Sequence, residues 1–186
     1  ATASKELLEA EKPNILQTIK LDKALRLSQQ KIKKGPAYEA RLKLNKMQEP
    51  PALHLQRLID IYNQGQIINA LKQSNQMIAK FPNSATLYNI LGAASAELGQ
   101  IDQAIASFQN SLKLDPNSAE VNYNLAVALE ENGELEHASK IYQKSIMLMP
   151  ANAEAHNNLG NTLMAMGNLE SAIKSFKRAI EIKPDF

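Results

Sequence analysis

The chain contains no cysteine and no tryptophan, and only 5% of its 186 residues are aromatic. Without cysteine it has no disulfide framework, no thiolate zinc site and no thiol nucleophile. No stretch approaches the roughly 20 consecutive apolar residues that a membrane-spanning helix needs. The first residues, ATASKELLEAEK, are charged and lack the apolar core of a secretory signal peptide. We therefore expect a cytoplasmic protein that does not bind a membrane.

Glycine and proline are also scarce, at seven and eight residues, but their placement is regular. Residues of three types recur 34 positions apart: Pro82, Pro116, Pro150 and Pro184; Gly65, Gly99, Gly133 and Gly167; Ala70, Ala104, Ala138 and Ala172. A fixed period of this length indicates stacked copies of one supersecondary unit. The sequence therefore predicts an open repeat array, not a closed globule.

Counting back from each proline divides the chain after residue 50 into four units: 51–84, 85–118, 119–152 and 153–186. Positions 4, 7, 8 and 11 of a unit share one face of a helix with about 3.6 residues per turn. Position 8 is small in three units, as Gly92, Ala126 and Gly160. The glycine at position 15 is placed to end this first helix, and the proline at position 32 to end a second one. Each unit is therefore predicted to be an antiparallel helix hairpin.

These residues resemble the tetratricopeptide repeat family, whose pattern is an aromatic residue, Leu-Gly, a second aromatic residue, and then Ala, Phe and Pro. The resemblance covers 51–186 and implies an all-α fold, a right-handed α-solenoid of antiparallel helix hairpins. The first unit departs most from the pattern, because Arg57 and Leu58 replace Leu-Gly and Ser74 replaces the second-helix aromatic residue. We expect its two helices to pack differently from the others.

Residues 1–50 do not follow this pattern, and we interpret them as an N-terminal helical cap with a degenerate repeat at about 21–50. They carry 11 Lys and Arg against 6 Asp and Glu, a net charge of +5, whereas residues 51–186 carry 10 against 13, a net charge of −3. Acidic residues accompany the basic ones, and interleaved aromatic residues are few. We therefore expect a solvated helix face or docking onto an acidic neighbour, and no nucleic-acid binding.

The outward face of the first helices is the predicted binding surface. Positions 2, 5, 6, 9, 12 and 13 lie nearly opposite the predicted core positions. In proteins of the tetratricopeptide family this face lines a concave groove that holds peptides. The residues that we expect to contact a bound segment are Asn89, Glu97, Glu120, Tyr123, Asn124, Val127, Glu131, Glu154, Asn157, Asn158 and Asn161.

Asparagine is frequent on this face. A carboxamide offers both donors and an acceptor, so a row of asparagines can pair with the backbone of a peptide whatever its side chains are. Asn124 and Asn158 resemble the asparagine ladder in the repeat arrays of O-linked N-acetylglucosamine transferases, because each directly precedes the Leu of the repeat pattern. Asn89 lies one residue early. The alternative interpretation is a set of polar residues that only face solvent.

The charge of this face indicates what it would bind. From residue 85 onward it carries no Lys or Arg, while Glu120 and Glu154 occupy position 2. Family members that grip the C-terminal carboxylate of a peptide use Lys, Asn and Arg on this face, so we expect no such clamp here. Glutamates favour a basic or neutral segment of the partner.

No pattern for catalysis, a cofactor or a metal is present. His54 and His156 occupy position 4, where the family prefers an aromatic residue, and are interpreted as core or partly buried residues. His137 has no companion at ligand spacing. Four acidic residues surround a predicted turn and are interpreted as a solvated surface: Glu130, Glu131, Glu134 and Glu136.

The sequence favours a non-enzymatic module that binds a protein or peptide partner. Two alternatives stay open. Arrays resembling this one often occur in bacterial proteins with a glycosyltransferase, sulfotransferase or methyltransferase domain, so the array could recruit substrates for a larger enzyme. It could also be a self-associating scaffold. The last hairpin places Ile173, Phe176 and Ile180 on an uncapped surface, where a homo-oligomer or a further repeat would dock.

Overall fold

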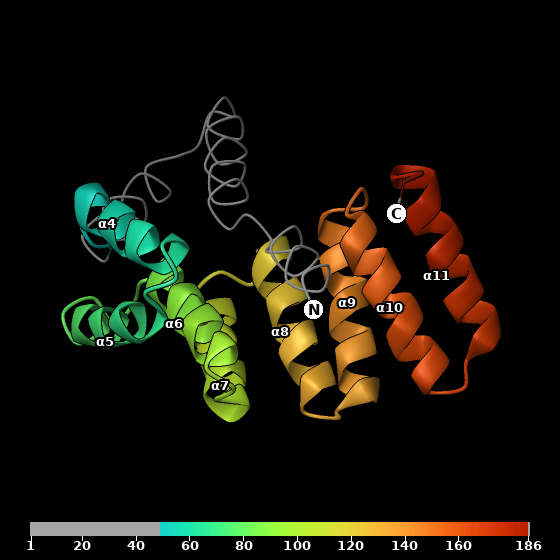
Figure 1. Cartoon of the computed structure of the whole chain (residues 1–186), viewed down its shortest axis with the longest axis horizontal. Helices are drawn as coiled ribbons and strands as arrows, with labels where there is room; N and C mark the ends of the chain where they lie inside the picture. The colour runs from blue at the N-terminus through green and yellow to red at the C-terminus, as the bar shows by residue number, and fades with distance from the viewer. Residues whose placement is uncertain (1–48, 186) are drawn as a thin grey trace, which may run out of the picture. The chain divides into compact units, whose positions relative to one another are not determined.

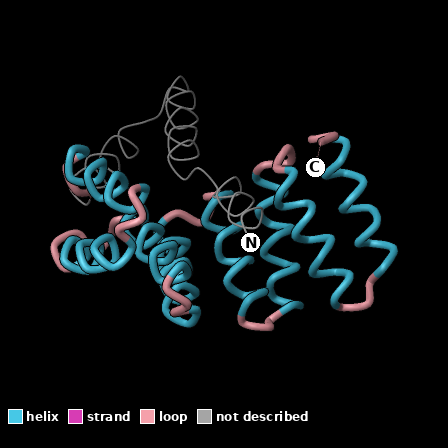
Figure 2. The backbone as a smooth tube through the Cα atoms, in the orientation of Figure 1, coloured by secondary structure: helices cyan, strands magenta, loops and turns pink. Residues whose placement is uncertain are grey.

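The structure is a computed structural model that describes residues 49–185. These residues belong to the second of the two units into which the chain divides, Lys43–Phe186. They form eight helices joined by short loops, with no strand between residues 49 and 185 (Figure 2). The prediction of an all-α fold is confirmed. Residues 1–48 of the predicted N-terminal cap lie outside the described residues.

The helices are the alternating members of four hairpins (Figure 1). The first members are α4 (Ala52–Asn63), α6 (Ala85–Glu97), α8 (Ala119–Glu131) and α10 (Ala153–Ala165). The second members are α5 (Ile67–Ile78), α7 (Ile101–Leu114), α9 (Leu135–Leu148) and α11 (Leu169–Ile182). Each second helix packs against its own first helix, and α5, α7 and α9 also pack against the first helix of the next hairpin. The hairpins are therefore stacked in chain order.

A glycine in the left-handed conformation follows every first helix. The φ angles of Gly65, Gly99, Gly133 and Gly167 are 74°, 70°, 80° and 78°, values that strain any residue with a Cβ. The residue after the glycine then donates its N–H to a carbonyl of the last helical turn, as Gln100 does to Ser95 at 2.9 Å. The predicted helix-ending role of these glycines is confirmed.

Polar side chains start three of the four first helices. Ser84, Ser118 and Asn152 precede α6, α8 and α10, and each side-chain oxygen accepts the backbone N–H three residues later, at 3.2, 3.3 and 3.0 Å. Such caps satisfy one of the amide groups that a helix start leaves unpaired. Ser84, Ser118 and Asn152 stand 34 residues apart, so the same cap recurs at equivalent positions.

The two helices of a hairpin approach closely where a small residue faces an aromatic ring. A Cβ atom on Gly92 would lie 2.6 Å from Cε1 of Phe108, and one on Gly160 would lie 2.5 Å from Cε1 of Phe176. Both distances are shorter than real Cβ contacts. The missing side chain at position 8 therefore makes the space that the ring at position 24 fills.

The first hairpin reverses these sizes. Leu58 occupies position 8 of α4 and Ser74 occupies position 24 of α5, and both side chains are fully buried. The Ser74 hydroxyl has no hydrogen-bond partner in the described part of the chain. The bulk that fills the space thus comes from the first helix instead of the second, so this hairpin packs differently, as expected.

A second buried surface joins each hairpin to the one before it. In α6, Leu87, Leu91 and Ala94, at positions 3, 7 and 10, are buried. Leu53 and Asp60 are the residues of α4 at positions 3 and 10, and both are exposed. No described hairpin precedes α4, whereas α6 follows the first hairpin. The preceding hairpin is therefore what covers positions 3 and 10 of a first helix. The sequence analysis included position 7 in the core but missed positions 3 and 10.

The expectation for position 4 is wrong for one of the two histidines. His156 is partly buried, and its Nε2 lies 3.1 Å from the carbonyl oxygen of Pro150, in the loop that enters its hairpin. His54 is exposed. Position 4 is covered by the loop from the preceding hairpin, and the described residues contain no hairpin before α4.

Tyr142 is the aromatic residue of the third hairpin and is fully buried. Its hydroxyl donates a hydrogen bond of 2.8 Å to Oε2 of Glu130, at the end of α8. Burial, and then the hydrogen bond and charge of Glu130, raise the pKa of Tyr142 well above its ordinary value. Because the folded state favours the neutral phenol, Tyr142 contributes stability that is complete below the unfolded pKa of about 10 and is lost as pH rises towards the folded pKa.

The size match between positions 8 and 24 can be tested by transplanting the first hairpin's pair into the second. We expect Gly92→Leu to cost about 1–3 kcal/mol or more through overpacking, and Phe108→Ser about 3–5 kcal/mol through loss of the buried ring. The double variant copies Leu58 and Ser74 of the first hairpin. Its loss in free energy of unfolding should therefore be at least about 1 kcal/mol smaller than the summed losses of the two single variants. Denaturant unfolding of all four proteins measures this coupling. Strict additivity would contradict the size match.

The tyrosines should titrate in two classes as pH is raised. We expect Tyr142 to ionise only together with the loss of helical circular dichroism, above the range in which exposed tyrosines ionise near pH 10. Phenolate absorbance and circular dichroism recorded on one sample measure both events. Tyr142→Phe should remove part of the high-pH absorbance change and leave the part that belongs to Tyr62, whose hydroxyl donates to Glu97 and whose pKa is also raised. Ionisation of every tyrosine near pH 10 with intact helices would contradict the burial of Tyr142.

Candidate functional site

The predicted contact residues lie on three successive first helices, and we call them the first-helix row. They are Asn89 and Glu97 on α6; Glu120, Tyr123, Asn124, Val127 and Glu131 on α8; and Glu154, Asn157, Asn158 and Asn161 on α10. Because the hairpins stack in order, residues at equivalent positions of neighbouring first helices come near one another. Hydrogen bonds join several of them directly.

The first junction, between α6 and α8, is made by two asparagines and a glutamate. Nδ2 of Asn89 donates to Oε1 of Glu120 at 3.1 Å, and Nδ2 of Asn124 donates to Oδ1 of Asn89 at 3.4 Å. Asn89 is buried, so it holds Glu120 and Asn124 in place by hydrogen bonds and offers little surface to a ligand. The prediction that Asn89 contacts a bound segment stays untested by this arrangement.

The second junction, between α8 and α10, repeats this geometry with a tyrosine. Nδ2 of Asn158 donates to the Tyr123 hydroxyl at 3.0 Å. The Tyr123 ring lies 6.0 Å from the ring of Tyr142, tilted by 59°, an arrangement that aromatic pairs prefer. Both junctions join position 5 of one hairpin to position 6 of the next. The placement of Asn89 one residue early is therefore what lets it meet Asn124.

The sequence analysis missed a third link of the same kind, between α4 and α6. The Tyr62 hydroxyl donates to Oε1 of Glu97. Burial, and then the hydrogen bond and charge of Glu97, raise the pKa of Tyr62 well above its ordinary value. Position 12, which Tyr62 occupies, belongs to the outward face by periodicity. The pairing could not be read from the sequence because it depends on how one hairpin is set against the next.

The remaining members of the row differ in exposure. Val127 and Asn157 are partly buried, whereas Glu131 and Asn161 are exposed. Glu154 is also exposed and lies 4.0 Å from Nζ of Lys183, which follows α11. The side chains of Asn157 and Asn161 form no hydrogen bond with another residue between 49 and 185.

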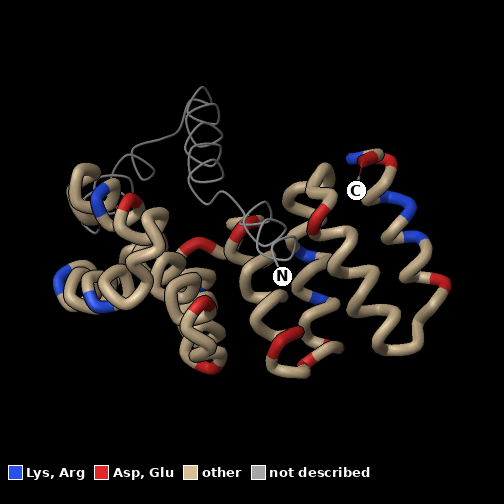
Figure 3. The backbone as a smooth tube through the Cα atoms, viewed as in Figure 1, with Lys and Arg blue, Asp and Glu red and all other residues tan. Residues whose placement is uncertain are grey.

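The hydrogen bonds within the row use up donors and leave acceptors. Asn124 and Asn158 each use their Nδ2 group to bond to the preceding hairpin. No residue between 49 and 185 donates to their Oδ1 atoms, which can therefore act as acceptors. The glutamates of the row add further acceptors with negative charge. Basic residues in the same part of the chain gather mainly on other helices, as the blue segments of α11 in Figure 3 show. The row can therefore receive hydrogen-bond donors.

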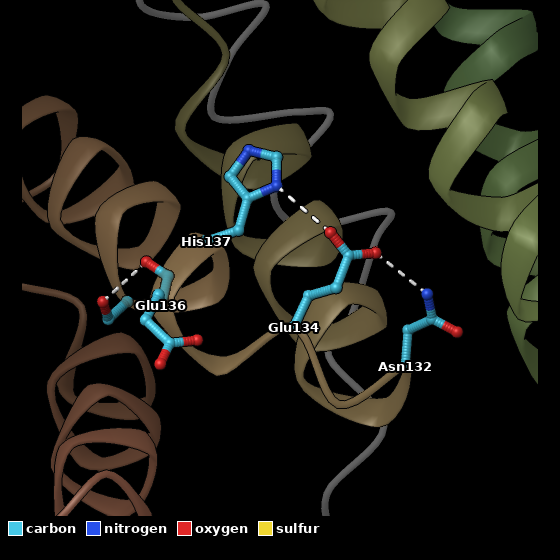
Figure 4. Close-up of polar contacts among 5 residues, drawn as sticks. Asn132, Glu134, Glu136 and His137 are labelled. Carbon is cyan, nitrogen blue, oxygen red and sulfur yellow. Dashed lines mark hydrogen bonds and ion pairs between the residues drawn. The ribbon is translucent and has the colours of Figure 1, made fainter.

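The acidic cluster at the α8–α9 turn does not form a site. Glu134 accepts hydrogen bonds from Nδ2 of Asn132 at 2.9 Å and pairs with Nδ1 of His137 at 3.5 Å (Figure 4). The bonds from Asn132 and His137 lower the pKa of the Glu134 carboxyl. Glu131 and Glu136 are exposed. The interpretation of this cluster as a solvated surface agrees with the exposure of Glu131, Glu134 and Glu136. It is wrong for Glu130, which is partly buried and accepts the hydrogen bond of the Tyr142 hydroxyl.

Residues 49–185 contain neither a cluster of metal ligands nor a membrane-spanning helix. No group of three or more His, Cys, Asp or Glu side chains is placed to hold a metal ion. No helix there is both long enough and apolar enough to cross a membrane.

Sequence models of one family match the second half of the chain. A model described as tetratricopeptide repeat matches residues 153–186, and one described as TPR repeat matches residues 94–133 and 131–167. The matches together extend over residues 94–186, the second to fourth hairpins except the start of the second. The comparison with curated proteins found no match.

Solved structures of a protein named MamA are similar to this chain. One MamA crystal structure is 28% identical, with a TM-score of 0.67 over 69% of this chain and 75% of that one. A second is 25% identical, with a TM-score of 0.66 over 70% and 72%. MamA from Desulfovibrio magneticus RS-1 is 21% identical, with a TM-score of 0.66 over 71% and 75%, and shows the likeness of fold alone.

These findings agree with the stacked hairpins, the left-handed glycines and the matched sizes at positions 8 and 24. They support an α-solenoid that serves in general as a protein-interaction or scaffold module. The chain belongs to the tetratricopeptide repeat family.

Proposed function

We propose that the array is a protein-interaction module that holds a segment of a partner protein along the first-helix row. The module comprises four repeats, 51–84, 85–118, 119–152 and 153–186, with residues 1–50 as its N-terminal cap. The observation that carries the proposal is the fixed orientation of Asn124 and Asn158. Each is hydrogen-bonded to the preceding hairpin, and each keeps a carboxamide oxygen for a donor on the ligand.

The spacing of these oxygens favours an extended ligand. They belong to neighbouring repeats at the same position, so one bound chain that runs along the stack can reach both. Asn157 and Asn161 add donors and acceptors on α10 that no described residue uses. Backbone groups are strong and obligatory hydrogen-bonding partners in any peptide, so this recognition needs no particular side chain.

The charge of the row favours a basic or neutral segment. Glu131 and Glu154 are exposed members of the row, and an acidic ligand would meet repulsion from both. Lys and Arg side chains of a partner would instead be attracted, and they add donors for the free acceptors. Because exposed charges are screened, this preference should weaken as salt is raised. No catalytic step is part of this function.

A selection from random peptides displayed on phage tests the character of the ligand. We expect the peptides that the full chain enriches to be rich in Lys and Arg and poor in Asp and Glu, and their binding to weaken with added salt. Enrichment of acidic peptides, or affinities that do not change with salt, would contradict the proposed charge preference.

A selected peptide then tests the asparagines. We expect Asn124→Ala with Asn158→Ala to weaken binding several-fold, because a lost hydrogen bond costs about 0.5–1.5 kcal/mol. Asn161→Ala removes an exposed carboxamide that has no partner among residues 49–185, so it should weaken binding with no change in thermal stability. The matched control is Asn75→Ala with Asn110→Ala, two asparagines on second helices. Isothermal titration calorimetry gives the affinities. If the Asn124→Ala, Asn158→Ala double variant and Asn161→Ala both bind as tightly as the wild type, the first-helix row is excluded as the binding surface.

A further inference from the structure

The outer face of α11 carries a stripe of exposed apolar residues. Leu169, Ile173 and Ile180 are 60%, 53% and 52% exposed, and they lie at helical spacings of four and seven residues, on one face. Residues at the same positions of α7 and α9 are all partly or fully buried, among them Ile105 and Ser139. The described helix packed against α11 is α10.

The internal junctions show what covers this face elsewhere. The matching faces of α7 and α9 are covered by α8 and α10. Each covering helix contributes two apolar residues and a small one at i, i+4 and i+7, and all of them are buried: Val121, Leu125 and Ala128 in α8, and Ala155, Leu159 and Thr162 in α10. The stripe on α11 therefore has the form of a surface that receives one more helix with this pattern.

The last hairpin is more apolar at this end than stacking alone requires. Met164 and Met166 are 52% and 37% exposed beside the α10–α11 turn. The third hairpin has Glu130 and Asn132 at these positions. Flexible methionine side chains adapt to different apolar partners. Residues 164–180 contribute five of the eleven large apolar residues that are exposed in the described part of the chain, so the patch is concentrated at this end.

A second copy of the chain is a poor fit for this face. Stacking copies head to tail would set α4 against α11, but α4 has Arg57 and Asp60 at the positions that α8 and α10 use for Leu and a small residue. Burying those charges without partners is costly. An antiparallel α11 pair that matched Ile173 with Ile180 would bring the two Lys177 side chains together, and like charges repel at short distance.

The free charges beside the stripe point to an acidic partner. Arg178 pairs with Glu181 at 2.8 Å, whereas Lys174 and Lys177 are exposed and no residue between 49 and 185 pairs with them. The N-terminal segment with Leu21, Leu25 and Ser28 has the right apolar spacing, but residues 18–35 carry six Lys and Arg against one acidic residue, Asp22. Its lysines and arginine would be repelled by Lys174 and Lys177.

We propose that the exposed face of α11, beside the α10–α11 turn, docks an acidic amphipathic helix of a partner protein, in the way that α8 docks on α7. The partner helix carries two apolar residues and a small one at i, i+4 and i+7, with Asp or Glu beside them to meet Lys174 and Lys177. This surface lies on a second helix, so it is distinct from the first-helix row and does not depend on it.

The probe for the test is a labelled peptide of residues 117–133 of this chain. It contains the pattern Val121, Leu125 and Ala128, and its only charged residues are Glu120, Glu130 and Glu131. We expect it to bind the full chain, and the same peptide with Leu125→Glu not to bind.

Ile173→Glu in the protein should lower the affinity about tenfold or more, because a carboxylate would have to be buried in the interface. Lys177→Glu should lower it several-fold. The matched control is Ile68→Glu, which changes an isoleucine on α5 that is 74% exposed and should have no effect.

Fluorescence anisotropy gives the affinities, and thermal unfolding verifies that each variant is folded. Three results would overturn the proposal. Equal affinity of the wild type and Ile173→Glu would place the peptide elsewhere. Tighter binding of a peptide of residues 18–35 would make the chain's own N-terminal segment the occupant. A dimer in sedimentation velocity that Ile173→Glu abolishes would make the occupant a second copy.

Discussion

The close contact between a side chain at position 8 and one at position 24 sets the geometry of each hairpin. Where Gly92 faces Phe108, there is no room for even one added carbon, so the ring fixes how near the two helices lie. In the first hairpin the same space is filled from the other side, by Leu58 against Ser74. What matters is the summed volume of the pair, since protein interiors are packed to nearly crystalline density.

The polar row on the first helices follows from this packing. Each hairpin presents positions 3, 7 and 10 to its predecessor, and that contact brings position 5 of one first helix beside position 6 of the next. The pairs Asn89–Asn124 and Tyr123–Asn158 both have this offset. The hydrogen bonds orient the carboxamides within the fold, and an oriented group loses less entropy when it binds. A repetitive core thus produces a repetitive polar surface.

The sequence predicted those features that depend on one unit alone. The glycines and prolines that end helices and the small residues at position 8 could all be found by comparing equivalent positions. Positions 3 and 10 escaped because the periodicity of one helix does not show that a second neighbour covers it. The links Tyr62–Glu97 and Asn158–Tyr123 escaped for a related reason. They join residues 35 apart, one more than the period, and only the stacking reveals that offset.

Site-specific crosslinking would test most directly whether the first-helix row is where a partner segment lies. The chain has no cysteine, so one cysteine can be introduced at a time and labelled with a photoreactive group. With a phage-selected peptide as the ligand, labels at Asn161→Cys and Val127→Cys should capture the peptide, whereas a label at Gln109→Cys, exposed on α7, should not. Capture from Gln109→Cys, or from neither position on the first helices, would contradict the account.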